Sequence, residues 1–315
     1  DMCEAGANGF TNTLRLKHRK PFVNLPSTRV LYGEEVRGCV VAKEGTKFVC
    51  SDLSAMENIW KFNYQMPYDP EYVKSQQSED FDPHLSIALM GGLVTEDEVS
   101  FFKIVKEGFP KENYPQTKRL LEMLSWDADK QNIEIKRISK VRAAGKGTNY
   151  SCQFGAAAPT VARTAKIDLS VAKTLVKSYK KMNWSIEPIC NSLTKKKVSH
   201  GTYQLNPMNG MWYHLKKDRD SFSTLIQGSG SYLLDIWVAY IFNLRNKPEY
   251  SVKGGLRLVA TVHDENLQEF NDLEGNEEIV RKLFDDALKM ANKKLNQEIP
   301  FGCDTQTGYK YSEIH

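Results

Sequence analysis

One stretch near the end of this 315-residue chain decides its fold: LRLVATVHDENLQEF, residues 256–270. The apolar run 256–262 and the second run 267–270 each predict a β-strand, and the His-Asp-Glu sequence between them predicts the tip of a hairpin. Polar tips of this kind are common in turns that have no function. The tip becomes informative through a second feature far upstream.

A second apolar stretch ends at Cys50, Ser51 and Asp52. Asp52 and Asp264 are therefore two aspartates at strand ends, which indicates a divalent-metal site. Hard oxygen ligands from separate elements can hold two ions about 3.5–4 Å apart, so that the ions activate a hydroxyl and neutralise a leaving phosphate.

A third feature is a four-residue repeat of cations and aromatics: Arg142, Lys146, Tyr150 and Phe154. This spacing places them on one face of a helix. An amphipathic helix with a cationic face would explain the pattern without any function. Three glycines favour a functional face, because they are poor helix formers and let a ligand or a backbone approach closely: Gly145, Gly147 and Gly155. Carboxylates for metal, cations for a polyphosphate and rings for a sugar and base together predict a nucleotidyl transferase.

Composition is ordinary for a soluble globular protein, with 41% hydrophobic and 26% charged residues. The longest purely apolar stretch, Ile236–Phe242, is too short to cross a bilayer, and no leader opens the chain, so we expect a soluble intracellular protein with no membrane partner. The six cysteines, Cys3 among them, contain no C-x-x-C pair, which favours reduced thiols. Because the first residue is Asp1, we expect the chain to be a piece of something longer.

The net charge of +4 is too small to establish a nucleic-acid partner. Residues 15–20 hold five cations in six positions beside Thr11, Asn12 and Thr13, which suits phosphate contact. For the run Lys195–Lys197 we favour a solvated face.

Local patterns predict the organisation of the chain. Residues 36–41 and 48–50 read as a strand pair around a turn at 43–47. Thr95, with Glu98 three residues later, predicts the start of a helix that ends before Gly108. Further helical patterns, with no strand among them, cover four segments: 114–126, 137–153, 161–182 and 185–197. A loop at 201–210 precedes a long buried helix at 219–245, and an amphipathic helix covers 276–297.

The order and spacing of these motifs resemble the family A DNA polymerases, the group of DNA polymerase I and its phage relatives. The similar segments, in chain order, are Thr13–Leu16 with Pro21–Pro26, Asp52–Glu57, Asp82–His84, Arg142 to Gly155, Arg219 with Gln227–Gly228, Val262–Glu265, and the ending Gly308 to His315. Three residues depart from the family pattern and suggest a divergent, bacteriophage branch: Ile59, Ser223 and Phe154.

The resemblance implies an α+β fold, a right-hand polymerase palm whose antiparallel sheet has flanking helices and carries a helical fingers insertion. The palm would comprise residues 1–60 and 201–315, and the fingers residues 61–200. The implied reaction is template-directed transfer of a dNTP to a primer 3′-hydroxyl in DNA replication, with primer-template DNA and dNTPs as partners.

Residue roles follow from the same resemblance. Catalysis would involve Asp52, Asp264 and Glu265, and two Mg²⁺ would be held by Asp52, the Leu53 carbonyl and Asp264. The dNTP would contact Ser54, Glu57, His84, Arg142, Lys146 and Tyr150. DNA would contact Arg15, Phe154, Arg219, Gln227 and His263.

Two alternatives remain open. One is a single-subunit RNA polymerase-like enzyme, although the bulky carboxylate of Glu57 would crowd a 2′-hydroxyl. The other is a non-catalytic DNA-binding polymerase fragment, because the chain begins just upstream of the palm. We accordingly expect an N-terminal thumb or exonuclease part, or a processivity factor, as a partner, and a cytoplasmic location in the host cell if a phage encodes the protein.

Overall fold

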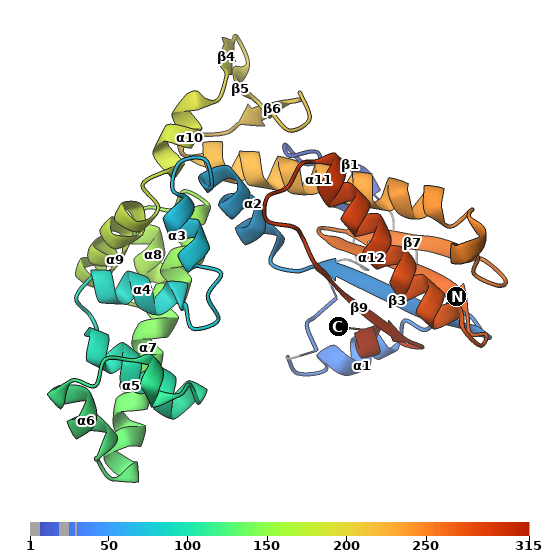
Figure 1. Cartoon of the computed structure of the whole chain (residues 1–315). Coiled ribbons are helices and arrows are strands. Elements are labelled where there is room, and N and C mark those ends of the chain that lie inside the picture. The colour runs from blue at the N-terminus through green and yellow to red at the C-terminus, as the bar shows by residue number, and fades with distance from the viewer. Residues whose placement is uncertain (1–6, 19–24, 29, 315) are drawn as a thin grey trace. The chain divides into compact units, whose positions relative to one another are not determined.

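The computed structural model describes residues 7–18, 25–28 and 30–314 (Figure 1). Several predictions from the sequence lie outside these residues: those on Asp1, Cys3, Arg19, Lys20, Pro21–Asn24 and His315. The chain divides into two compact units. The first, which we call the sheet unit, comprises residues 1–64, 193–216 and 224–315, and the second, the helical unit, comprises 65–192 and 217–223.

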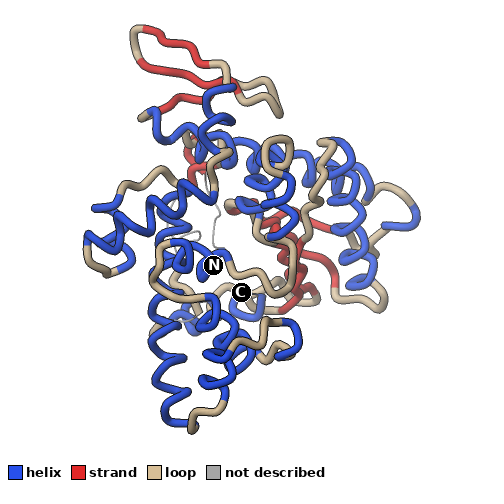
Figure 2. The backbone as a smooth tube through the Cα atoms, turned by 60° about the vertical axis from the view of Figure 1, so that its left-hand side comes forward, coloured by secondary structure: helices blue, strands red, loops and turns tan. Residues whose placement is uncertain are grey.

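The sheet unit contains a four-stranded antiparallel sheet in the order β7-β8-β3-β9. Its strands are among the segments drawn red in Figure 2. Its strands are β7 (Leu256–Val262), β8 (Glu265–Asn271), β3 (Thr46–Leu53) and β9 (Cys303–Gly308). The predicted hairpin around residues 263–265 is confirmed, because β7 and β8 pair up to Val262 and Glu265.

The two faces of this sheet differ. On one face Phe48 and Cys50 pack with Leu267 and with the 3₁₀ turn η5 (Tyr311–Ile314). On the other, Val49, Ser51 and Leu53 are buried. This alternation is the period-2 pattern of a strand covered on both sides.

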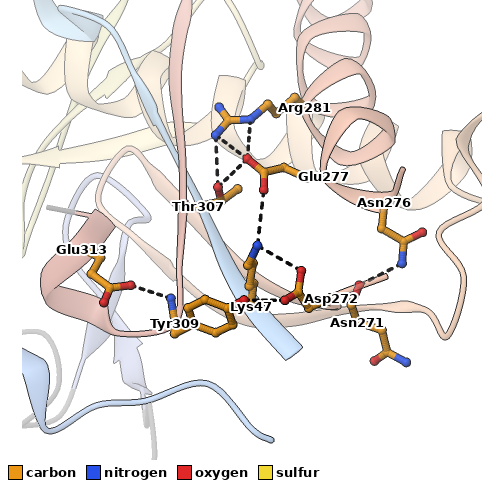
Figure 3. A network of polar contacts seen from close by, with 9 residues as sticks. All are labelled: Lys47, Asn271, Asp272, Asn276, Glu277, Arg281, Thr307, Tyr309 and Glu313. Carbon is orange, nitrogen blue, oxygen red and sulfur yellow. Dashed lines mark hydrogen bonds and ion pairs between the residues drawn. The ribbon is translucent and has the colours of Figure 1, made fainter. Parts of the chain in front are cut away.

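Helix α12 (Asn276–Lys294) is tied to the sheet by a polar network (Figure 3). Lys47 of β3 forms ion pairs with Asp272 at 3.0 Å and with Glu277 at 3.8 Å. Arg281 of α12 binds Glu277 and donates to the Thr307 hydroxyl of β9. It also donates to the Thr305 carbonyl of the same strand. The long helix α11 (Ser221–Leu244) is linked to α12 by the Trp237 indole, which donates to the Phe284 carbonyl at 2.9 Å. Both long C-terminal helices were predicted, and both are confirmed.

The strand predicted over residues 36–41 is wrong. The helix α1 (Gly33–Gly38) covers its first half, and Val41 makes only a single bridge with Lys310. Two acidic residues in the first turn favour a helix start, and Gly33 is required because a Cβ there would lie 1.9 Å from the Ser27 carbonyl oxygen. Short apolar runs do not distinguish strand from helix, which is why the pattern misled.

The helical unit is built from short helices around one long one, α7 (Ala128–Gln153). The others are α3 (Pro70–Ser75), α4 (Pro83–Met90), α5 (Glu96–Glu107), α6 (Lys118–Leu124), α8 (Ala158–Ala165), α9 (Leu169–Met182) and α10 (Ile186–Ser192). The prediction for Thr95 is confirmed by a complete capping box with Glu98. The single helix predicted over 161–182 is two helices, because Lys166 adopts a left-handed conformation between them. The short helix α2 (Met56–Gln65) runs from the sheet unit to its boundary with this unit.

The prediction that 185–197 contains no strand is wrong, and so is the loop predicted at 201–210. A three-stranded antiparallel sheet joins β4 (Lys195–Val198), β5 (Gly201–Leu205) and β6 (Trp212–Leu215) in the sheet unit. Consecutive lysines have little intrinsic preference for strands, so pairing with β5 decides the structure. A separate two-stranded ribbon pairs β1 (Ala7–Phe10) with β2 (Leu16–His18). None of the described helices combines the length and apolar character that crossing a membrane requires.

Candidate active site

Strand register brings three carboxylates into one row. Asp52 of β3 pairs with Glu265 of β8 on one side and with Asp304 of β9 on the other. Paired residues in an antiparallel sheet project from the same face, so the three side chains are neighbours. Asp264 joins them at the hairpin tip, because the Leu53 amide donates to its carbonyl oxygen at 3.2 Å.

A cavity of about 320 Å³ opens at this row. Its lining residues are Cys50, Asp52, Asp264, Glu265, Asp304, Gln306 and Ile314. The three residues predicted to be catalytic, Asp52, Asp264 and Glu265, are thus brought together from segments more than 200 positions apart. Sequence reasoning missed Asp304, because only the register of β9 against β3 places it beside Asp52.

Asp264 is the half-buried carboxylate of the cavity. Burial raises the pKa of Asp264, the Arg15 guanidinium opposes this rise, and the charge of Glu265 adds to it. Among the described residues, no three His, Cys, Asp or Glu side chains form a metal-ligand group by themselves. The donors that do converge are carboxylate oxygens, which are the ligands Mg²⁺ prefers, and Mg²⁺ commonly uses one or two carboxylates together with substrate phosphates. The chemistry of the site therefore fits this ion.

Hydrogen bonds from Tyr311 and Cys50 hold the side chain of Glu265. The Tyr311 hydroxyl donates to Glu265 Oε1 at 3.4 Å, and the Cys50 thiol also hydrogen-bonds to this carboxylate. Burial raises the pKa of both Cys50 and Tyr311, so both stay protonated and act as donors. Glu265 is thereby held in one orientation at the cavity wall.

A second group of predicted residues meets beside Asp264 in the sheet unit. Burial raises the pKa of Glu57, while the charge of Arg15 and a hydrogen bond to Gln227 oppose this. Two nitrogen atoms of the Arg15 guanidinium, Nε and Nη2, are buried without a hydrogen-bond partner in the described structure. Such donors are suited to an incoming anionic or carbonyl ligand. The exposed His263 lies near His18, whose pKa is lowered mainly by burial and also by His263.

In the helical unit the predicted stripe lies on α7 and faces solvent. Tyr150 is 49% exposed and Phe154, which caps the helix, is 40% exposed. The ammonium of Lys146 lies 5.9 Å from the centre of the Tyr150 ring. Exposed aromatic and cationic groups in this arrangement can hold a planar, anionic ligand.

The start of α4 places His84 beside this stripe. Asp82 caps the helix, accepting hydrogen bonds from the amides of His84 at 2.8 Å and Leu85 at 3.0 Å. The His84 ring centre is 6.2 Å from that of Tyr150. Arg142 forms an ion pair with Asp82. Burial opposes ionisation of Asp82, but the Leu85 amide and the guanidinium of Arg142 outweigh it and lower the pKa.

Gly145 and Gly147 of α7, and Gly155 just after its end, are explained by protein packing. A Cβ at Gly145 would lie 2.2 Å from the His84 carbonyl oxygen, and one at Gly155 would lie 2.5 Å from that of Arg219. Gly147 packs against Ala165 of α8. The glycines therefore admit neighbouring segments, and Gly145 sets the position of His84. The exposed Arg219 lies by the end of α7, whereas Gln227, its partner in the predicted motif, belongs to the sheet unit.

The fold is of the kind found in DNA polymerase POL domains. One solved structure that it resembles is the POL domain of Pol1 from M. smegmatis, in complex with DNA primer-template and dNTP, with a TM-score of 0.61 and 16% sequence identity. The match covers 96% of this chain and 47% of that one, so the chain spans about half the length of its neighbour. At this identity the likeness concerns the fold, a mixed α and β structure with antiparallel sheets. Neither a family model nor a curated protein matches the sequence.

Proposed function

We propose that this chain is the catalytic portion of a template-directed DNA polymerase, which transfers the nucleotidyl group of a dNTP to a primer 3′-hydroxyl. The observation that carries the proposal is the meeting of Asp52 and Asp264 at one cavity. The likeness of the fold to a POL domain supports it independently.

In this proposal Asp52, Asp264 and the Leu53 carbonyl hold two Mg²⁺. When bound, the ions lower the pKa of the primer hydroxyl and neutralise charge on the transferred phosphoryl group and the leaving pyrophosphate. The chain's own contribution is rigidity. Asp52 lies within a paired strand, and the amide of Leu53 ties that strand to the tip carrying Asp264.

Other residues of the sheet unit would hold the primer-template. Arg15 and Gln227 offer donors to the duplex, and His263 and Glu265 would lie by the primer end. Ser54 and Glu57 would contact the nucleotide sugar. Because a half-buried carboxylate beside the sugar would leave little room for a 2′-hydroxyl, Glu57 would favour dNTPs over NTPs.

Residues of the helical unit would bind the rest of the nucleotide. Lys146, Arg142 and His84 would neutralise and orient the triphosphate, since positioning and electrostatics account for most of phosphoryl-transfer catalysis. Tyr150 and Phe154 would stack on bases, and Arg219 would contact the template strand. Because the chain spans 47% of its structural neighbour, we propose that further polymerase parts complete its grip on DNA.

Primer extension with Mg²⁺ tests the proposal. The parent chain should extend a primed template with dNTPs, far less with NTPs, and Asp264→Asn should abolish extension while DNA binding persists. The control Asp285→Asn changes an exposed aspartate of α12 and should retain activity. Extension by Asp264→Asn at the parental rate would exclude this site as the catalytic centre. Preferential use of NTPs would favour the RNA polymerase alternative, and DNA binding without extension would favour the non-catalytic fragment.

A further inference from the structure

The segment 193–216, which carries the β4–β5–β6 sheet, has a one-sided charge. It contains four lysines and two histidines and no aspartate or glutamate. In a chain where 39 of 315 residues are acidic, 24 consecutive residues without a carboxylate create a local positive field. The lysine run 195–197 is exposed, as predicted for a solvated face. The structure also shows that it belongs to a strand paired with β5, which the sequence did not predict.

The two faces of this sheet are unlike. Gln204, Tyr213 and Leu215 are buried, and Tyr213 packs against Gly228 of α11, where a Cβ would lie 2.8 Å from its ring. Register places the opposite set on the other face. Lys196 pairs with Tyr203, which pairs with His214, and Leu205 pairs with Trp212. Because paired residues and alternate residues of a strand share a face, these side chains form one surface, which we call the outer face of β4–β5–β6.

Rings dominate the outer face. Tyr203 lies between two histidines, with ring centres 5.7 Å from His200 and 5.3 Å from His214. Gly201 makes room for the second histidine, since a Cβ there would lie 2.6 Å from His214 Nε2. Trp212 is 45% exposed although it is large and apolar. The outer face thus combines partly exposed aromatic rings with the charge of Lys196.

We propose that the outer face of β4–β5–β6 binds single-stranded DNA. Lys196 on this face attracts the phosphates, and the rings of Tyr203 and Trp212 stack on bases, which is how unpaired strands are held without sequence preference. Charge alone would serve a duplex equally well. Exposed rings add affinity only for unstacked bases, so the surface favours the single strand. The choice of DNA over another polyanion rests on the proposed polymerase function, in which such a strand is the unpaired template.

Fluorescence anisotropy with a labelled 15-nucleotide oligo(dT) tests this without dNTPs or Mg²⁺, and so apart from catalysis. We expect Trp212→Ala and Tyr203→Ala each to weaken binding by roughly 5- to 100-fold, the range measured for loss of one base–aromatic stack. Lys196→Gln should weaken binding and reduce the slope of log affinity against log salt by about 0.7. The matched controls Tyr68→Ala and Lys294→Glu alter an exposed ring and an exposed cation elsewhere and should bind as the parent does.

Thermal melts identify any variant that fails to fold; Trp212→Ala, at a half-exposed position, is the decisive one. Parental affinity of Trp212→Ala for oligo(dT) would overturn the stacking surface, as would a loss of blunt-duplex binding in this variant equal to its loss of oligo(dT) binding. Tighter binding of oligo(U) than of oligo(dT) would assign the surface to RNA and overturn the choice of DNA. The proposed function has its own test: it is contradicted if the parent chain does not extend a primer, whatever the binding results.

Discussion

The acidic cavity of the sheet unit and the cationic face of α7 are built in opposite ways. The cavity draws Asp52, Asp264 and Asp304 from three segments, which are joined only by strand register. The face of α7 draws Lys146 and Tyr150 from a single helix by four-residue spacing. A sheet therefore fixes charges that are far apart in the sequence, whereas a helix presents charges that are already close.

The two regions also differ in how their side chains are held, and this predicts different kinetic roles. Asp52 and Asp304 lie in paired strands and a backbone hydrogen bond ties Asp264 to β3, whereas Lys146 and Tyr150 project from the exposed face of one helix. Groups held rigidly at the reacting atoms stabilise the transition state and change kcat. Exposed groups that contact the nucleotide contribute binding and change mainly KM.

The strongest test of this division is Asp52→Asn. We expect kcat for primer extension to fall by at least about 10³-fold at saturating dNTP, since loss of a metal ligand removes several kcal/mol of charge stabilisation. Steady-state kinetics measure it. Asp304→Asn is the matched control, because Asp304 lies on the far strand from Asp264 and should retain most of kcat. Equal losses in both variants would show that the whole carboxylate row acts as a unit.

Lys146→Ala tests the other region. We expect KM for dNTP to rise by roughly 10- to 100-fold with a smaller change in kcat, because a charge-assisted hydrogen bond to phosphate contributes about 1.5–3 kcal/mol. Lys140→Ala removes an exposed lysine from the same helix outside the stripe and should leave KM unchanged. A loss confined to kcat would contradict the division between the regions.

Much of both regions could be predicted from the sequence, for reasons that differ. The stripe of α7 follows from local spacing, and the cap at Thr95 follows from a four-residue motif. Asp52 and Asp264, the proposed metal ligands, were singled out because each follows an apolar run. Asp304 could not be identified, since its strand, CDTQTG, lacks apolar alternation and gains its place only by pairing with β3.

Strands without an apolar face were missed for the same physical reason. β4 is three lysines and a valine, and its sheet is stabilised by pairing and by the buried side of Tyr213 and Leu215. In the opposite direction, the apolar residues of 36–41 suggested a strand, but α1 covers 36–38 and Val41 makes a single bridge. The secondary structure of such segments depends on pairing with strands that are distant in the sequence and on the path of the chain into the segment. Local periodicity encodes neither of these.

The packing of α7 on α4 predicts an effect on stability. Gly145→Ala places a methyl group against the His84 carbonyl, and the backbone must shift, which should lower the free energy of unfolding by about 1–3 kcal/mol. Gly147→Ala is the graded control, because its nearest neighbour is the Ala165 methyl at 3.0 Å and the cost should be smaller. Urea denaturation measures both. If the two variants were equally stable, tight packing would not be what positions His84.

The smallest effect concerns the charge on Asp82, which joins α4 to the cationic face. Asp82→Asn keeps an N-cap side chain but weakens the pairing with Arg142, so the free energy of unfolding at pH 7 should fall by about 1 kcal/mol.

The sign of the pH dependence follows from the lowered pKa of Asp82. Between the folded and unfolded pKa values the unfolded chain binds more protons, so the stabilisation is complete above the ordinary pKa of about 3.9 and is lost as the pH falls through the lower folded value. The difference between parent and variant should therefore be constant from pH 7 to about pH 5 and shrink below about pH 4. Asp168→Asn, at an exposed N-cap without a side-chain cap bond, should show almost no difference at any pH. If the difference in free energy of unfolding between the parent and Asp82→Asn stayed the same below about pH 4, the ion pair would not be what stabilises this end of the cationic face.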